Sequence, residues 1–278
     1  MIALIASILV APDDSFEGAK KLDLMTSRQP ASAAKKPIGD LVMQFGLALR
    51  ETPYVGWTLE RDMNSETCYV SLDRLDCVTF FESALGIARA FKLGGGKVTP
   101  QSVLQQVTLT RYWGGGPVKS YTDRIHYTSD WIFDNTRKGV VKDVCAGNPL
   151  ATRFNVPLDF MSKHPNTYPK IKAHPELLQG IKKTEAESNK RVKWYFPAAN
   201  LAEAAKELKT GDIIGITCTT PGMDCAHTGI IVVTPDGPHF MHASSTEKKV
   251  VFDRLITEVI ANNPKYTGIM VARPLEPR

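Results

Sequence analysis

The sequence predicts an α+β fold, with helices in the first part of the chain and an antiparallel sheet in the last part. Two observations support this prediction. Between residues 38 and 111 the apolar residues recur at helical spacing, whereas residues 213–272 contain short β-branched runs separated by turn residues. Because the helical and strand patterns are segregated rather than alternating, the sheet is expected to be antiparallel.

Residues 1–37 are predicted to be a leader or linker, and residues 38–278 a single folded domain. The first ten residues are apolar but too few to span a bilayer. They are similar to the core of a secretory signal without its positive flank, so we expect export to the periplasm or cell envelope. Residues 11–37 are rich in Ala, Ser, Lys and Pro, which is typical of weakly ordered segments. No other stretch predicts an integral membrane segment.

Three helices are expected in the first part of the domain. Residues 38–50 carry an amphipathic helical pattern, and residues 57–75 form an irregular connector to the next helix. That second helix begins at Cys77, and three consecutive glycines from Gly94 end it. Thr99 then provides an N-cap for a third helix, which has a proline at its first position.

The middle of the chain, about residues 97–198, is predicted to be a long insertion of helices and loops. Loops rich in aromatic and ionisable side chains often line binding sites, although anchoring of a surface loop explains them equally well. The candidate substrate-binding residues of this segment are Tyr112, Trp113, Arg124, His126, Asp130 and Trp131.

The last part of the chain predicts a helix over residues 199–208 and then the sheet. A Gly-Asp turn leads into the first strand, and Pro235-Asp236-Gly237 gives the turn of a hairpin. The expected strands are residues 213–218, 227–234, 240–244, 250–252 and 269–272.

Composition excludes some classes of function. The 278 residues carry a net charge of +5, and the basic residues form no stripe interleaved with aromatics, so nucleic acid is not an expected partner.

The five cysteines are an odd number. Cys218 and Cys225 are close in sequence and suit either a short-loop disulfide or two free thiols.

Cys77 is the strongest candidate for chemistry. Asp76 before it is a good N-cap, which places Cys77 in the first turn of a mostly buried helix. The partial positive charge of a helix N-terminus stabilises a thiolate, so the site suits a nucleophile. The alternative is a small apolar cysteine that begins a core helix.

A cysteine nucleophile needs a base and a group that orients the base. His227 opens one hairpin strand and His242 lies in the returning strand, so the two imidazoles are expected side by side. His239 has the opposite parity to His242 and is expected to point to the other face. One ring would accept the Cys77 proton and the other would orient the first.

The ordered set of Asp76-Cys77, Leu208 to Asp212, His227 to Val232 and Phe240 to Ser244 resembles the NlpC/P60 superfamily of cell-wall hydrolases. Tyr54 and the residues after Cys77 are closer to its DUF1460 branch, which looks like a family of N-acetylmuramoyl-L-alanine amidases. One departure is Val78-Thr79, where the superfamily usually has Ser-Gly.

The resemblance implies a papain-like core that uses Cys77, His227 and His242 without a cofactor or metal, with Tyr54 and Asp76 beside the substrate. It implies peptidoglycan fragments as partners and the amide between N-acetylmuramic acid and L-alanine as the bond cleaved, through a thioester. Three alternatives stay open: a D-glutamyl-diaminopimelate endopeptidase, a non-catalytic cell-wall binding protein, and a zinc site. The zinc ligands would be Cys218, Cys225, His227 and His242.

Overall fold

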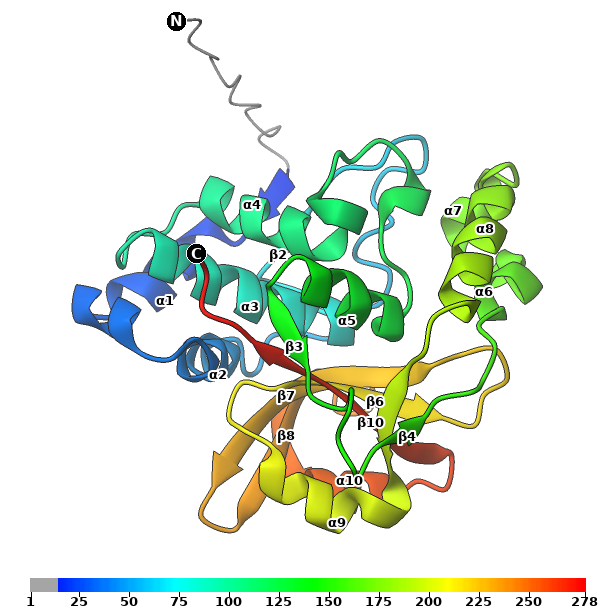
Figure 1. Cartoon of the computed structure of the whole chain (residues 1–278). Coiled ribbons are helices and arrows are strands. Elements are labelled where there is room, and N and C mark those ends of the chain that lie inside the picture. The colour runs from blue at the N-terminus through cyan, green and yellow to red at the C-terminus, as the bar shows by residue number, and fades with distance from the viewer. Residues whose placement is uncertain (1–14) are drawn as a thin grey trace, which may run out of the picture.

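A computed structural model describes residues 15–278, and its main feature is a sheet with helices on both faces (Figure 1). The helices on the larger, helical side are α1 (Ala19–Ser27), α2 (Ile38–Ala48), α3 (Cys77–Leu93), α4 (Pro100–Arg111) and α5 (Thr128–Arg137). Beside them lie α6 (Phe160–Lys163), α7 (Pro169–Ala173) and α8 (Leu177–Asn189), and the opposite face carries α9 (Leu201–Ala204) and α10 (Ile256–Ala261). Short 3₁₀ turns are η2 (Ala31–Lys35), η3 (Trp113–Gly115), η4 (Tyr121–Asp123), η5 (Pro165–Thr167), η6 (Ala198–Asn200) and η7 (Ala205–Glu207).

The main sheet has eight strands in the order β4-β5-β10-β6-β7-β8-β9, with β3 also paired to β10. Every pairing in it is antiparallel. The strands are β3 (Val141–Asp143), β4 (Thr152–Arg153), β5 (Trp194–Pro197), β6 (Ile213–Cys218), β7 (Cys225–Thr234), β8 (Gly237–Ser244), β9 (Lys249–Leu255) and β10 (Tyr266–Pro274). A separate parallel pair joins β1 (Phe16–Glu17) to β2 (Val70–Ser71).

The predicted mixture of helices and an antiparallel sheet is confirmed. The segment 97–198, predicted to be an insertion of helices and loops, also contributes to the sheet and the core. Its strands β3 and β5 pair with β10, and its helix α4 packs along α3. These strands have two to four residues each, which is too short for a period-two pattern to reveal them.

The structure also differs from the predicted domain boundary at residue 38. Helix α1 docks on the core and buries Leu22 and Met25, so the folded part already includes residues 15–37. Apolar burial of this kind is what a linker lacks. The apolar run of residues 1–10 lies outside the described residues.

Helix α3 is the centre of the larger apolar cluster. Every residue from Thr79 to Phe91 is buried, which is the pattern of a helix covered on all sides. Its neighbours α2 and α4 cover its flanks, and β7 and β8 form its floor. A second cluster on the far face of the sheet includes Phe240 and the α10 residue Ile256.

A close backbone contact fixes the turn into β6. Gly211 has a φ of +88°, and a Cβ at this position would lie 2.3 Å from the Cα of Gly39 in α2. Asp212 then accepts two bonds of 2.8 Å from Arg273 in β10. The Gly-Asp pair therefore locks the sheet against α2, which is a structural role.

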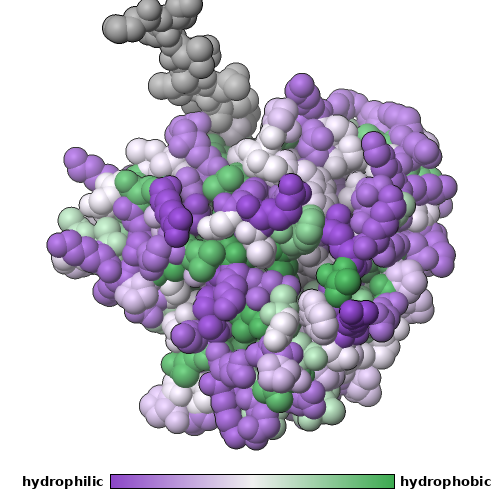
Figure 2. Space-filling view, viewed as in Figure 1, coloured by the Kyte–Doolittle hydropathy of each residue, from purple (hydrophilic) through white to green (hydrophobic). Residues whose placement is uncertain are grey.

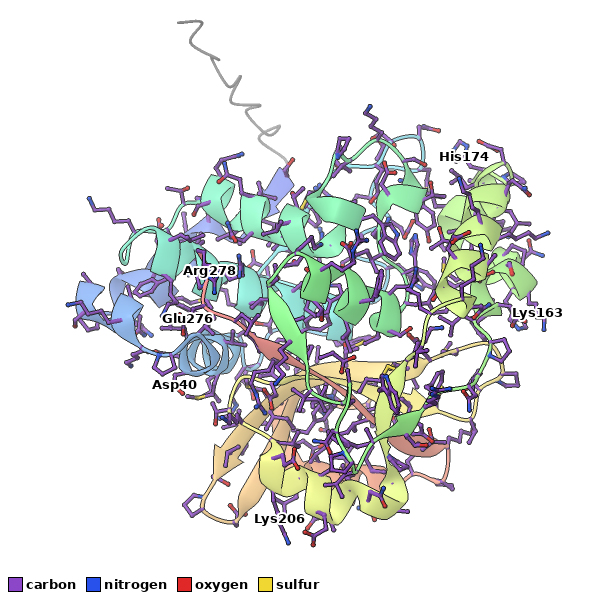
Figure 3. The ribbon with its side chains drawn as sticks, viewed as in Figure 1. Asp40, Lys163, His174, Lys206, Glu276 and Arg278 are labelled. Atoms are coloured by element: carbon purple, nitrogen blue, oxygen red, sulfur yellow. The ribbon has the colours of Figure 1, made fainter. Side chains whose placement is uncertain are left out.

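Hydrophilic residues cover most of the face seen in Figure 2, with smaller apolar patches between them. The labelled residues Lys163, His174 and Lys206 lie at the edges of the molecule in Figure 3. Glu276 near the C-terminus accepts the N–H of Ile38 at 2.9 Å and pairs with Lys92 at 2.7 Å, so the tail is tied to α2 and α3. Within residues 15–278 no helix has the length and apolarity to cross a membrane.

Candidate active site

Cys77 is the first residue of α3, as predicted, and a capping box holds it there. The carboxylate of Asp76 accepts the N–H groups of Val78 at 3.0 Å and Thr79 at 2.8 Å. The Thr79 hydroxyl accepts the Asp76 N–H in return. The hydrogen bonds of the Asp76 carboxylate are therefore used to cap the helix. The half-buried Cys77 lies at the positive N-terminal end of α3.

The resting charge of Cys77 differs from the expectation of a ready thiolate. Burial and, to a lesser extent, the neighbouring Asp76 carboxylate raise the pKa of the Cys77 thiol to about 11. The N–H and hydroxyl of Thr228 face the sulfur and oppose this rise in pKa only in part. The sulfur is therefore a neutral thiol at neutral pH and needs a base to become a nucleophile.

His227 in β7 and His242 in β8 meet as the hairpin pattern predicts. His227 Nε2 lies 2.6 Å from His242 Nδ1, and the rings are perpendicular with centroids 4.7 Å apart. His239 is not part of this pair, because its ring stacks on Phe252 and bonds the carbonyl of Asp253. The parity argument about these three histidines is confirmed.

Both imidazoles of the pair are neutral at neutral pH. Burial and, to a lesser extent, the facing His242 ring lower the pKa of His227 to about 3. Burial also lowers the pKa of His242, although Asp253 opposes the change. The Nε2 of His227 is hydrogen-bonded to His242. The Nδ1 of His227 is therefore the nitrogen that can take a proton from a nucleophile.

Thr228 places the nucleophile candidate beside β7. It directly follows His227 in β7, and its N–H and hydroxyl face the Cys77 sulfur from the floor beneath α3. The α3 N-terminus and the start of β7 thus come together at one end of the hairpin, although about 150 residues separate them in sequence.

A cavity of about 480 Å³ opens beside the imidazoles. Its lining includes His227, His242, Asp253 and Tyr266, and the Tyr266 and Tyr54 hydroxyls both lie within electrostatic reach of Cys77. Burial raises the pKa of both tyrosines, so each keeps its proton and can donate a hydrogen bond. No sequence motif marks Tyr266 or Asp253 as residues of a site.

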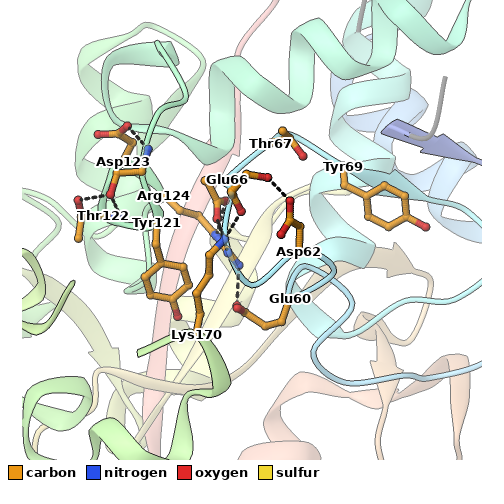
Figure 4. A network of polar contacts seen from close by, with 12 residues as sticks. Glu60, Asp62, Glu66, Thr67, Tyr69, Tyr121, Thr122, Asp123, Arg124 and Lys170 are labelled. Atoms are coloured by element: carbon orange, nitrogen blue, oxygen red, sulfur yellow. Dashed lines mark hydrogen bonds and ion pairs between the residues drawn. The ribbon is translucent and has the colours of Figure 1, made fainter. Parts of the chain in front are cut away.

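The predicted substrate-binding residues Tyr112 and Arg124 are buried in a polar cluster around Glu66. Figure 4 shows Arg124 beside Glu66 and Glu60. Arg124 makes a two-pronged contact with Glu66, at 3.0 and 2.9 Å, and also pairs with Glu60 at 3.1 Å. The Tyr112 hydroxyl donates to Glu66 at 2.9 Å, and Lys170 binds the same carboxylate at 3.0 Å. These side chains hold the connector 57–75 to the rest of the fold.

The remaining candidates of that stretch also have internal partners. Asp130 accepts from Ser188 at 2.6 Å and pairs with Arg191, and Trp131 packs its ring edge-on against Phe81. The His126 Nε2 bonds the Tyr121 carbonyl at 3.0 Å. Trp113 is half-buried beside Arg191 in a second surface pocket that does not include the imidazoles. The structure therefore does not bring these residues to the imidazole pair.

The zinc alternative has no support in the geometry. In the part of the chain that the structure describes, no three His, Cys, Asp or Glu side chains are grouped as a metal site. Cys218 and Cys225 are free thiols, as are the other three cysteines.

Solved structures give close matches to this fold. An N-acetylmuramoyl-L-alanine amidase from Bacteroides uniformis is 34% identical, with a TM-score of 0.78 over 86% of this chain and 99% of that protein. A Bacteroides fragilis protein described as a candidate xylanase is 33% identical, with a TM-score of 0.75 over 83% of this chain and 99% of that one. A DUF1460 protein from Legionella pneumophila shares the fold at 21% identity and a TM-score of 0.67, over 92% of this chain and 94% of that one.

A comparison of families gives the assignment. No curated protein sequence matches the chain at a significant level. The AmiA-like family, described as N-acetylmuramoyl-L-alanine amidase-like, matches residues 44–269. This span contains Cys77 and both paired histidines. The chain therefore belongs to the AmiA-like family of N-acetylmuramoyl-L-alanine amidase-like proteins.

Proposed function

We propose that the protein is a cysteine amidohydrolase with a papain-like NlpC/P60 core, which cleaves the amide between N-acetylmuramic acid and L-alanine in peptidoglycan fragments. The observation that carries the proposal is the His227–His242 contact of 2.6 Å, made from the strand whose next residue, Thr228, faces the Cys77 sulfur. An acyl-transfer site needs these parts: a nucleophile, a base and a group that orients the base.

The resting charges favour a general-base mechanism. Neutral His227 takes the Cys77 proton at Nδ1 while the sulfur attacks the amide carbonyl. The N–H of Cys77, which has no carbonyl one turn earlier to bond, can donate to the oxyanion. His227 then returns the proton to the leaving amine of L-alanine. Water, deprotonated by the same imidazole, hydrolyses the thioester and releases the lactyl carboxylate and free Cys77.

Two alternative functions differ from this proposal, one in the bond that is cleaved and the other in having no catalytic activity. The same three residues would serve a D-glutamyl-diaminopimelate endopeptidase, because the chemistry of the two amides is alike. A non-catalytic cell-wall binding protein would have no need for a neutral, hydrogen-bonded imidazole pair beside a capped cysteine.

The test uses three substrates and mass spectrometry of the products. They are a muramyl stem peptide, the same peptide without its sugar, and a disaccharide stem peptide. We expect cleavage of the lactyl amide in both sugar-bearing substrates, with the stem peptide intact, and no cleavage by Cys77→Ala. Cleavage of the sugar-free peptide at D-glutamate would replace the amidase by the endopeptidase. Cleavage between the two sugars would instead indicate a glycosidase, and binding without products a non-catalytic protein.

We also propose that the protein acts in the periplasm or elsewhere in the cell envelope, where its substrate is made available. Fractionation of cells that express the tagged full chain tests this location. Recovery in the cytosolic fraction alone would contradict it.

A further inference from the structure

We propose that Asp253 is a positioning residue, which fixes the tautomers of both imidazoles so that His227 presents an unprotonated Nδ1. The proposal concerns the site of the proposed function and rests on that function for its effect on rate. The observation behind it is a continuous chain of contacts. His227 Nε2 lies 2.6 Å from His242 Nδ1, and His242 Nε2 lies 3.4 Å from Asp253 Oδ2.

Two arrangements of protons satisfy the bond between the imidazoles. In the first, His227 carries its proton on Nε2 and donates to His242 Nδ1, so His242 must carry its own proton on Nε2. In the second, His242 donates from Nδ1, which leaves a lone pair on its Nε2 and a proton on His227 Nδ1. Only the first arrangement gives a base that can accept a proton at Nδ1.

The carboxylate of Asp253 selects between the two arrangements. An ionised carboxylate only accepts hydrogen bonds, so it attracts an Nε2–H and repels an Nε2 lone pair. Burial works to raise the pKa of Asp253, but the Arg254 N–H and His242 lower it below its usual value overall. Asp253 is therefore ionised at neutral pH and favours the arrangement with an unprotonated Nδ1 on His227.

The strand geometry directs Asp253 to this position. His242 pairs with Val251 across β8 and β9, so Asp253 is its diagonal neighbour on the same face. The register then shifts by one residue between the pairs His239–Leu255 and Met241–Phe252. This β-bulge gives β9 one extra residue opposite β8, and bulges of this kind commonly re-aim side chains near sites.

The neighbouring groups leave one oxygen of the Asp253 carboxylate to His242. The ring of His239 donates from Nδ1 to the Asp253 carbonyl at 2.8 Å, and its Nε2 pairs with Asp236 at 3.0 Å. The other charged or titratable side chains that face the cavity beside Asp253 are Glu247, Arg254 and Tyr266. Arg254 also contacts the second carboxylate oxygen at 3.4 Å, which leaves Oδ2 for His242.

Nitrogen NMR of the histidine side chains in the full chain tests the tautomers directly, without any substrate. In the native protein we expect His242 protonated on Nε2 alone and His227 on Nε2 alone. Asp253→Asn offers His242 an amide that both donates and accepts, so both tautomers become populated. We expect kcat for the amide to fall at least about 10-fold, with KM changed less than about twofold. Asp253→Glu restores a carboxylate and part of kcat.

The matched control is Asp236→Asn, which removes the carboxylate from His239 rather than from His242. It should leave the tautomers of the pair and kcat unchanged. A His242 protonated on Nδ1 in the native protein, or an Asp253→Asn variant with native tautomers and native kcat, overturns the proposal. If the tautomers shift as expected but no substrate is cleaved by the native protein, the proposed function fails while the role of Asp253 stands.

Discussion

The polar cluster around Glu66 is buried and the imidazole pair of His227 and His242 is largely buried, but they differ in charge. Glu66 is ionised, because Arg124 and Lys170 lower the pKa of its carboxyl although burial works to raise it. The imidazoles are neutral, because burial lowers the pKa of each ring. A compensated charge cluster is hard to rearrange, whereas a neutral imidazole keeps a lone pair that can accept a proton. The first cluster therefore fixes the fold and the second suits chemistry.

Removal of the base should have the largest effect, and at neutral pH it should change the rate and not the stability. In His227→Ala we expect kcat/KM for the muramyl substrate to fall by about 10⁴-fold, because the thiol loses its proton acceptor. His242→Ala should cost less, roughly 10²-fold, since it removes only the orienting partner. Steady-state kinetics measure both effects, and thermal melts should show a fold as stable as the native one within a few degrees.

The order of the two variants decides the roles. A His242 variant slower than the His227 variant would reverse base and orienting group. A His239→Gln variant with a comparable loss would mean that the wrong ring has been placed in the site.

Breaking the charged cluster should instead lower the stability of the fold. Glu66→Gln leaves Arg124 and Lys170 buried without a full counter-charge, and we expect a loss of about 3–5 kcal/mol in the free energy of unfolding. Urea denaturation measures it. The control is Glu51→Gln, which breaks the exposed pair with Lys249 and should leave the midpoint unchanged. Equal stability of Glu66→Gln and the native protein would show that the cluster does not hold the fold.

The pair of histidines could be predicted from sequence because local rules govern it. A short turn and a period of two place His227 and His242 on one face, and an Asp before an apolar helix places Cys77 at its start. These rules depend on near neighbours in the chain. The order of helices and strands was also enough to indicate the class of fold.

The other features of the fold and the site could not be predicted, because they depend on contacts between residues that lie far apart in sequence. Arg124 was predicted to face substrate because its stretch is polar and aromatic, but its partner Glu66 lies in the irregular connector, where no pattern indicates a contact. Asp253 reaches His242 across a bulge whose position the sequence does not mark. Tyr266 comes to the site only through the pairing of β10 with β6.

Alkylation tests the charge assigned to Cys77. Because the pKa of its thiol is about 11, the rate of reaction with iodoacetamide should rise roughly tenfold per pH unit from pH 7 to pH 10. Mass spectrometry of tryptic peptides gives the rate for Cys77, and Cys77→Ala identifies the peptide. A rate that is already constant above pH 6 would indicate a stable thiolate–imidazolium pair instead.

The neutral pair should make the protein less stable in acid. The unfolded chain protonates His227 near pH 6.5, whereas the native protein does so only near pH 3. Between these values the unfolded state binds more protons, so stability falls as pH falls, by up to about 1.4 kcal/mol per pH unit. In His227→Ala the loss between pH 6.5 and pH 4 should be smaller. Parallel curves for the two proteins would contradict the low pKa.

The contribution of His239 to stability should depend on pH in the opposite direction to that of His227, and it should be the smallest of these effects. Burial works to lower its pKa, but the Asp253 carbonyl and the Asp236 carboxylate raise it above its usual value overall. Its contribution to stability is then complete below pH 6.5, the value for the unfolded chain, and disappears as pH rises through the folded pKa. We expect His239→Gln to melt slightly below the native protein at pH 5.5 and together with it at pH 9, with kcat nearly unchanged at both. Calorimetry at the two pH values measures the difference. A deficit in melting temperature that grows with pH would mean that His239, like His227, is held neutral, and the contrast between the two rings would be lost.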